Sequence, residues 1–334
     1  PEAMWAARVL GKPLISAEAF THASVRHMNL RHDGPRGGLV LREDPSKMWR
    51  TTPALLRGLS NAHFARGVNR IQIHSFSYSP PGVPDPGWRM YAEIHLNRNV
   101  SWWPELEGYA RWTARNQLVL QAGVPVADAL VYPVEPNPIE PPFNVRDDQP
   151  WSAMNAVDGA HADLLSRLVD GRGAASYPVH RVVLRDDIPT LAEAEDLLAL
   201  LRAGIPVWCG HTLPGEWTGL QGSDEEVARV RAELERAAED GRLIDARGQG
   251  WRGVVEAERS VGWPEGALLS FQHRRVGEAH VYFVASWEKP FTGEVTFPHD
   301  TLAPERWDAD SGQPKPLKGR SVEGGRTALA LELG

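Results

Sequence analysis

A short apolar strand that leads into an acidic residue places the strongest limit on how this 334-residue chain folds. Residues 4–10 have the pattern of a helix end, Gly11–Pro13 is a helix stop signal, and an apolar strand at 13–17 then leads to Glu18. A helix, a turn, a strand and an acidic residue in this order are typical of a βα repeat. In such repeats the functional residues lie at the carboxyl ends of the strands. The order therefore predicts a parallel α/β unit with Glu18 as a candidate catalytic carboxylate.

The same alternation of strands and helices continues to about residue 135. Two further strands are expected at 69–76 and 128–134. A helix begins after Thr52, a plausible N-cap, and ends at Gly67, and a second helix spans about 104–121. Long connections rich in Pro, Gly, His and Arg follow the first two strands, and loops of such length are usually functional or disordered.

The pattern changes in the rest of the chain, which we divide into two further regions after the first at 1–150. Residues 151–262 combine apolar strands with two helices, each opened by a capping box, and indicate a small α/β domain. Residues 263–334 contain short strands separated by turn residues and predict a β-sandwich module. The expected fold class is therefore α/β plus all-β.

Composition excludes several classes of function. The net charge of -7 and the scattered arginines argue against a nucleic-acid partner. No stretch is apolar enough to span a bilayer, and no signal peptide is visible. The single cysteine, Cys209, excludes an internal disulfide and lies in an apolar run, which predicts a buried structural thiol. The 13 tryptophans suit carbohydrate, whose C–H faces stack on indole rings.

Two of the candidate functional side chains lie at expected strand ends. Glu18 is a candidate base, nucleophile or metal ligand, and its alternative is an ion pair with Arg26 or Arg31. His74 ends the second strand on the face opposite to Ile71 and Ile73, and its alternative is a hydrogen-bonded structural histidine.

A second group of candidates contains polar and aromatic side chains suited to sugar. Asn97 and Arg98 can bind hydroxyl groups, and Trp102 or Trp103 can stack on a sugar ring, although the tryptophans also suit a core. Glu135 follows the third expected strand, in a position equivalent to that of Glu18.

Several motifs in this order resemble the α-L-rhamnosidases of glycoside hydrolase family 106 over nearly the whole chain. The motifs are Ala17–Thr21, Gly67–Arg70 with His74, Asn97–Arg98 with Trp102–Trp103, Val126–Asp128, Val157–Leu165, Gln272–Arg274 with Tyr282–Val284, and Arg306–Asp308 with Ser311–Gly312. The resemblance implies a (β/α)8 catalytic barrel, hydrolysis of terminal α-L-rhamnosides with inversion, an association with calcium, and a periplasmic or extracellular enzyme. A carbohydrate is then the expected partner.

Carried over residue by residue, the resemblance makes Glu18 the general base that activates water. Inversion needs a second carboxyl group about 6.5–9.5 Å away as the acid. The family carries this acid on an Asp-Ser-x-Glu motif of an earlier strand, and the chain contains no such motif. The sugar contacts would come from His22, His74, Asn97, Arg98 and Glu135, together with Tyr78 where the family often has His-Gln-Pro.

Three strands cannot close a barrel, because their edges would expose unpaired backbone groups. We therefore expect residues 1–150 to be the C-terminal part of the barrel in a longer enzyme, and the chain alone to be inactive. Two alternatives remain at this point. One is a non-catalytic carbohydrate-binding or scaffold fragment, and the other is a related barrel glycosidase such as a β-galactosidase.

Overall fold

The computed structural model describes most of the chain, and every structural statement below concerns the described residues. These are residues 12–20, 30–32, 39–41, 49, 51–74, 76–88, 94–126, 128–133, 156–158, 181–186, 190–210, 212–249, 254, 259–286, 289–300 and 303–334. None of the helices among them is long and apolar enough to cross a membrane.

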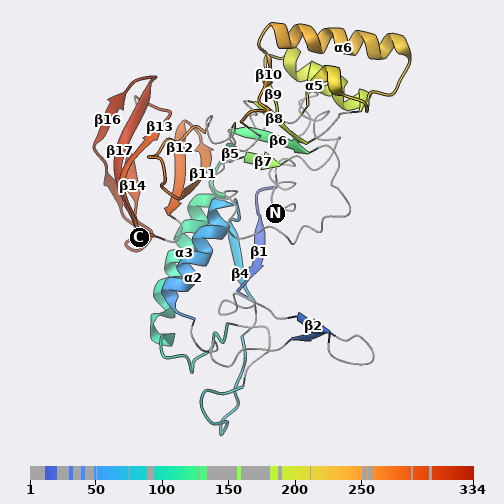
Figure 1. Ribbon diagram of the computed structural model, residues 1–334. Helices are drawn as coiled ribbons and strands as arrows, with labels where there is room; N and C mark the ends of the chain where they lie inside the picture. The colour runs from blue at the N-terminus through green and yellow to red at the C-terminus, as the bar shows by residue number, and fades with distance from the viewer. Residues whose placement is uncertain are drawn as a thin grey trace.

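A β–α–β–α unit forms the N-terminal part of the described structure (Figure 1). Strands β1 (Ser16–Ala19) and β4 (Arg70–Ile73) pair in parallel, with Glu18 opposite Gln72. Helix α2 (Pro53–Ala65) connects them, as a parallel pair requires. After β4 come the short helix η2 (Trp103–Glu105) and helix α3 (Leu106–Gln121). The two strands and two helices predicted between residues 12 and 121 occur in the predicted order, with an additional strand pair at 30–32 and 39–41 in the first long connection. The helix end predicted at 4–10 lies outside the described residues.

Local signals in the sequence explain where these two helices begin and end. The hydroxyl of Thr52 accepts a hydrogen bond from the backbone N–H of Leu55 at 3.2 Å, and Pro53 occupies the first turn. Gly67 and Gly123 follow the helices with φ angles of 104° and 60°, which favour glycine. The buried faces of the helices contain Leu56, Phe64, Tyr109, Trp112 and Leu120.

The helices cover one face of the β1–β4 pair. Ala19, Phe20 and Ile71 pack into the same apolar cluster as Leu56 and Tyr109. Because side chains alternate along a strand, Glu18 and Gln72 project from the opposite face. The helix-covered face is therefore apolar, and the other face carries the candidate site.

Asn69 anchors the start of both strands. Its Oδ1 accepts a hydrogen bond from the Ile15 N–H at 2.7 Å, and its Nδ2 donates to the Pro13 carbonyl at 2.8 Å. Its own carbonyl accepts from Nε2 of Gln121 at the end of α3. Asn69 is 1% exposed, so water cannot replace these partners without a change in structure.

We expect Asn69→Ala to lower the free energy of unfolding by about 2–3 kcal/mol, because it leaves the buried Ile15 N–H without an acceptor. Urea denaturation followed by circular dichroism measures the change. Asn116→Ala is the control, since its amide donates to the Trp112 carbonyl one turn earlier in the same helix and, among the described residues, to no distant partner. Equal effects of the two substitutions would contradict the anchoring role.

A five-stranded parallel sheet forms the second part of the structure. Its order is β10 (Leu243–Asp245), β9 (Val207–Cys209), β8 (Val182–Asp186), β6 (Ala129–Pro133) and β7 (Ala156–Asp158). Helices α5 (Leu191–Arg202) and α6 (Asp224–Glu239) pack against it through one apolar cluster, and the 3-10 helix η4 (Pro214–Glu216) lies between β9 and α6 along the chain. Both helices open with the predicted capping boxes, at Thr190 and Ser223.

Cys209 lies in the core of this second part. It is fully buried on β9, and burial raises the pKa of its thiol to about 12. A protonated, inaccessible thiol is a poor nucleophile, so the prediction of a structural thiol is confirmed.

The strand predicted at 128–134 is present as β6, but it does not pair with the strands of the first unit. The third strand expected in the barrel region corresponds to β6, and β6 pairs with β7 and β8 rather than with β1 or β4. The residues that the structure describes contain one parallel β1–β4 pair and no closed barrel. The pattern of a buried strand does not encode its partner, which is why the local signal led to the wrong sheet.

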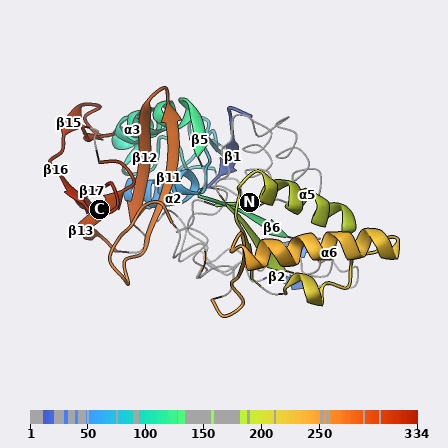
Figure 2. The ribbon, with the colours of Figure 1, turned by 90° about the horizontal axis from the view of Figure 1, so that it is seen from above.

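Two three-stranded antiparallel sheets form most of the C-terminal part (Figure 2). The first contains β12 (Ala279–Ser286), β11 (Leu269–Val276) and β5 (Val124–Val126), and the second contains β13 (Phe291–Phe297), β17 (Arg326–Leu333) and β16 (Gly319–Val322). They share one apolar core, which includes Phe271, Val295 and Leu329. Two small hairpins, β14 (Glu305–Trp307) with β15 (Pro314–Pro316) and β2 (Leu30–His32) with β3 (Leu39–Leu41), complete the described elements.

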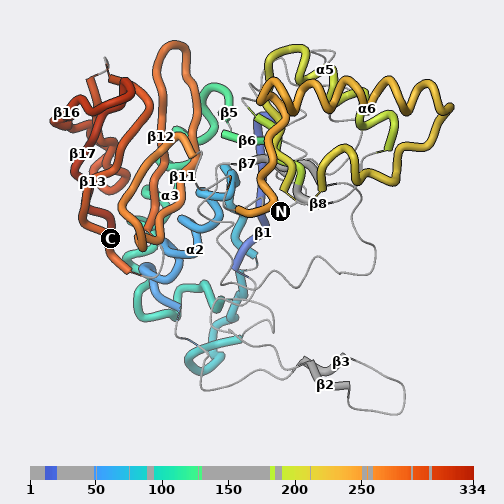
Figure 3. The backbone as a smooth tube through the Cα atoms, turned by 45° about the horizontal axis from the view of Figure 1, so that its top comes forward, coloured from blue at the N-terminus to red at the C-terminus, as the bar shows by residue number. Residues whose placement is uncertain are grey.

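The C-terminal sheets pack onto α2 and α3 (Figure 3). The ring of Phe64 on α2 meets Phe283 of β12 edge-on at 5.8 Å between centroids. The guanidinium group of Arg57 binds both carboxylate oxygens of Asp310, and Arg115 donates to the carbonyl groups of Ala309 and Asp310. The helices of the first unit therefore lie between its two strands and the C-terminal sheets.

Candidate functional site

Glu18 and His74 form the centre of the candidate site. His74 directly follows β4, and its backbone N–H continues the ladder by donating to the Ala19 carbonyl at 2.9 Å. This places the imidazole beside Glu18 at the carboxyl ends of two adjacent parallel strands. Nδ1 of His74 lies 2.6 Å from Oε1 of Glu18. The structure thus joins the first two residues that the sequence nominated.

The two side chains differ in their exposure to solvent. The Glu18 side chain is 67% exposed, whereas that of His74 is 23% exposed. With Nδ1 donating, the hydrogen bond orients the carboxylate and leaves its second oxygen accessible to water. Nε2 of His74 is buried and has no hydrogen-bond partner among the described residues. The pair therefore offers an exposed carboxylate for proton transfer, and its imidazole has a second, buried ring nitrogen without a partner among the described residues.

Three non-glycine residues have left-handed backbone conformations, and one of them, Phe20, directly follows β1. Phe20, two residues after Glu18, has a φ of 70°, and Trp49 and His95 have φ angles of 59° and 58°. The rings of Trp49 and His95 lie 4.4 Å apart between centroids. Left-handed conformations of non-glycine residues cost about 1–3 kcal/mol each and tend to occur at functional sites. The conformation of Phe20 supports a site at this end of the strands.

Asn97 is a buried polar residue in the segment that precedes η2. It is 3% exposed, and its Oδ1 accepts a hydrogen bond from the Asn99 N–H at 2.9 Å. Its Nδ2 has no hydrogen-bond partner in the described part of the chain. Arg98 beside it is exposed. Asn97 therefore has one buried amide donor without a partner among the described residues.

The two predicted stacking residues have different surroundings. Trp102 is 8% exposed and packs in the core cluster of α2 and α3. Trp103 is only partly buried, and its ring lies 5.9 Å from that of Phe76, two residues after His74. Of the two rings, that of Trp103 is thus the accessible one, and it lies close to the segment that carries His74.

The loop after His74 carries exposed aromatic side chains. Phe76, Tyr78 and Trp88 are 55%, 65% and 59% exposed. The hydroxyl of Ser79 accepts a hydrogen bond from the Trp88 N–H at 2.8 Å, which closes the loop on itself. The sequence reasoning missed Phe76 and Trp88, although aromatic residues in a long loop rich in proline were a visible signal.

The structure does not test the predicted sugar-binding roles of four candidate residues. His22 and Glu135 lie outside the described residues. No hydrogen bond or ion pair in the described structure joins Tyr78 or Arg98 to Glu18 or His74. The roles of all four therefore stay predictions.

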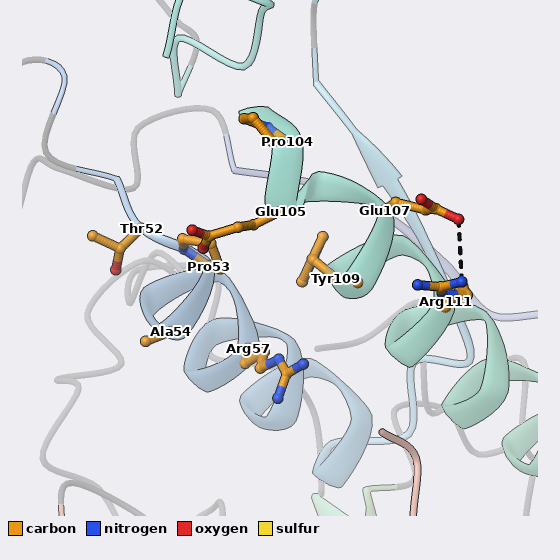
Figure 4. A pocket seen from close by; sticks show the side chains of 10 residues that line it. Thr52, Pro53, Ala54, Arg57, Pro104, Glu105, Glu107, Tyr109 and Arg111 are labelled. Atoms are coloured by element: carbon orange, nitrogen blue, oxygen red, sulfur yellow. Dashed lines mark ion pairs between the residues drawn. The ribbon is translucent and has the colours of Figure 1, made fainter. Parts of the chain in front are cut away.

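A surface hollow lies between the first turns of α2 and α3, and it is separate from the Glu18–His74 pair (Figure 4). Its lining includes Thr52, Arg57, Glu105, Glu107 and Arg111, and none of the predicted site residues. The cations already have partners, since Arg111 pairs with Glu107 at 3.1 Å and Arg57 with Asp310. We therefore do not assign the active site to this hollow.

Comparison with known proteins defines the family. The model of glycoside hydrolase family 106, described as alpha-L-rhamnosidase, matches residues 44–320. The chain belongs to this family. The resemblance in the sequence motifs is thereby confirmed.

Two similar proteins are much longer than this member of glycoside hydrolase family 106. A Formosa agariphila protein named "Putative beta-glucuronidase" is 28% identical over 312 residues, which cover 86% of the chain and 25% of that protein. A rhamnosidase from Novosphingobium sp. PP1Y has a similar structure, with a TM-score of 0.66 and 20% identity over 99% of the chain. The chain spans 31% of that rhamnosidase.

Calcium, which the family resemblance implies, does not fit the described residues. Calcium takes six to eight oxygen ligands, several of them carboxylates. Among the described residues, the sole group of three or more His, Cys, Asp or Glu side chains close enough to share a metal ion consists of histidines. We derive no step of the reaction through calcium.

Proposed function

We propose that this chain is the part of an inverting α-L-rhamnosidase that carries the general base, with Glu18 as that base. The observation that carries the proposal is the contact between Glu18 and His74 at the carboxyl ends of adjacent parallel strands. Such ends are where barrel enzymes place catalytic residues. Membership of glycoside hydrolase family 106 supports the reaction type.

In the proposed reaction, the exposed carboxylate of Glu18 takes a proton from a water molecule as that water attacks the anomeric carbon. His74 holds the carboxylate through Nδ1 and offers Nε2 to a sugar hydroxyl group. Nδ2 of Asn97 and the guanidinium group of Arg98 would bind further hydroxyl groups. The ring of Trp103, next to Phe76, would stack on the sugar.

The general acid, calcium ligands and a periplasmic or extracellular location belong to the full-length enzyme in this proposal. Inversion requires the acid on the opposite side of the sugar ring, about 6.5–9.5 Å from Glu18. The chain contains no Asp-Ser-x-Glu motif, so the acid would come from sequence outside it. We therefore expect residues 1–334 alone to be inactive on aryl α-L-rhamnosides.

The test uses the full-length enzyme and a panel of aryl glycosides. We expect hydrolysis of the α-L-rhamnoside, and proton NMR at early times should show release of the β-anomer. Release of the α-anomer would contradict inversion. If residues 1–334 alone hydrolysed the aryl α-L-rhamnoside at a rate comparable to that of the full-length enzyme, the general acid could not lie outside this chain.

A second candidate is a barrel glycosidase that acts on another sugar. The similarity to a protein named "Putative beta-glucuronidase" favours it, and aryl β-glucuronides and β-galactosides in the same panel distinguish it. A non-catalytic carbohydrate-binding fragment is the third candidate, supported by the exposed rings of Phe76, Tyr78 and Trp88. This candidate would be favoured if the full-length protein showed no hydrolysis but bound sugar, and if substitution of Trp103, but not of Glu18, abolished that binding.

Two substitutions at His74 separate its proposed roles. His74→Asn keeps a donor near the position of Nδ1 and removes Nε2, so we expect KM to rise about tenfold with a smaller change in kcat. His74→Gln keeps a polar atom near Nε2 and removes the bond to Glu18, so we expect kcat to fall more than in His74→Asn. Steady-state kinetics of the full-length variants measures both. Identical kinetics for the two variants would contradict the division of roles.

A further inference from the structure

Three histidines come together in the C-terminal part, away from the candidate active site. His273 lies on β11, His280 on β12, and His299 two residues after β13. One ring nitrogen from each lies within 4.8 Å of the other two. Nε2 of His273 is 2.8 Å from Nδ1 of His280, and the rings of His280 and His299 are 3.9 Å apart between centroids.

The sheet register explains this convergence. His273 lies opposite Tyr282 and Arg275 lies opposite His280 in the antiparallel β11–β12 pair. Side chains two positions apart share a face, so His273, His280 and Tyr282 project from the same face. His299 comes from the second sheet, where its carbonyl accepts a hydrogen bond from the Thr327 hydroxyl on β17. Residues distant in the sequence and on two different sheets thus meet at one point.

The contact between His273 and His280 also requires a neutral imidazole. A hydrogen bond between two ring nitrogens needs one lone pair as its acceptor, so at least one of the rings is not protonated. Neutral imidazole is the form that binds metal ions. Burial and the nearby charge of Arg275 lower the pKa of His280, and the charge of Glu278 partly offsets them.

We propose that His273, His280 and His299 together bind one transition-metal ion of the Zn²⁺ class, with water as the fourth ligand. Three imidazoles suit zinc, copper and nickel, whereas calcium and magnesium prefer oxygen. A tetrahedral ion with Zn–N distances of 2.0–2.1 Å separates its ligand atoms by about 3.4 Å. The His273–His280 separation of 2.8 Å is shorter than this value, and no pair of the three ligand atoms is more than 4.8 Å apart, so the three nitrogens lie within reach of one ion after side-chain adjustment.

The surroundings of the cluster resemble those of a metal centre. The hydroxyl of Tyr282 lies 2.9 Å from Nε2 of His299, and its ring stacks on His273 at 4.2 Å between centroids. Partners of this kind orient ligating histidines and raise metal affinity. His273 is 5% exposed, whereas His280 and His299 are partly exposed, so an ion and its water can enter from that side. Tyr282 is a positioning residue here.

The bound ion would connect the two C-terminal sheets. Two of its ligands come from the β11–β12 hairpin and the third from the chain that leaves β13. Helix α2 separates this region from β1 and β4 (Figure 1). We therefore assign the site a role in joining the two sheets, and it does not depend on the proposed hydrolase reaction.

The test is zinc binding by the chain without an affinity tag. After treatment with EDTA and dialysis, isothermal titration with ZnCl₂ and metal analysis after gel filtration should both give one zinc per chain. Zinc should also raise the midpoint of thermal unfolding by a few degrees, because it binds only the folded state. A stoichiometry well below one at micromolar protein and zinc would overturn the proposal.

Variants determine whether the three histidines hold the ion. His280→Gln and His299→Gln should each weaken zinc binding at least 100-fold, and Tyr282→Phe by about tenfold. His63→Gln, at a partly buried histidine on α2, is the matched control and should bind zinc like the unmodified chain. Circular dichroism checks that each variant is folded. Undiminished binding in both His280→Gln and His299→Gln would overturn the proposal.

Discussion

Replacement of Glu18 by Gln is expected to lower the kcat of the full-length enzyme by about 10²–10⁴-fold, with little change in KM. The amide keeps the size of the side chain and its contact with His74, but it cannot accept a proton from water. The side chain is 67% exposed, so the folded structure should be unaffected. Steady-state hydrolysis of an aryl α-L-rhamnoside measures the loss.

Glu107→Gln is the matched control for this substitution. Glu107 is an exposed glutamate on α3 whose ion pair with Arg111 lies away from the candidate site. We expect its kcat to equal that of the unmodified enzyme. If Glu18→Gln retained more than a tenth of the original kcat, Glu18 would not be the general base.

Phe64→Ala is expected to lower the free energy of unfolding by about 3–5 kcal/mol, the range typical of a buried Phe. Phe64 is fully buried on α2 and contacts Trp112 of α3 and Phe283 of β12, with ring centroids 6.0 and 5.8 Å apart. Its loss opens a cavity where the helices meet the C-terminal sheets. Urea denaturation of the chain, followed by circular dichroism, measures the change.

Leu118→Ala is the control for Phe64→Ala. Leu118 also lies on a helix but is 73% exposed, so its removal should change the free energy of unfolding by less than about 0.5 kcal/mol. A cost below 1 kcal/mol for Phe64→Ala would mean that the C-terminal sheets do not depend on this contact.

Most helices and strands could be predicted from the sequence, because their signals are local. Thr190 and Ser223 open α5 and α6 with capping boxes formed by residues three positions apart. Strand β12 (Ala279–Ser286) lies in the region 263–334, where the sequence predicts strands separated by turns. Such signals act between near neighbours in the chain, so they survive in any tertiary context.

The pairing of strands that lie far apart in the sequence could not be predicted. Strand β6 carries the expected apolar run but pairs with β8, about fifty residues later. Strand β5, placed in the barrel region by its position in the chain, pairs with β11 of the C-terminal sheet. A buried strand pairs where its apolar side chains are buried and its backbone groups form hydrogen bonds, and the available partners depend on the whole fold.

The sequence by itself determined the family, the helices, and the nomination of Glu18 and His74 at strand ends, because each depends on residue types and spacing. Only the tertiary structure decided that these two side chains touch, since β1 and β4 are brought together by the packing of α2 and α3. It also placed Trp102 in the core and left Trp103 accessible. The cluster of His273, His280 and His299 exists only because two sheets share one core, and no local pattern records that contact.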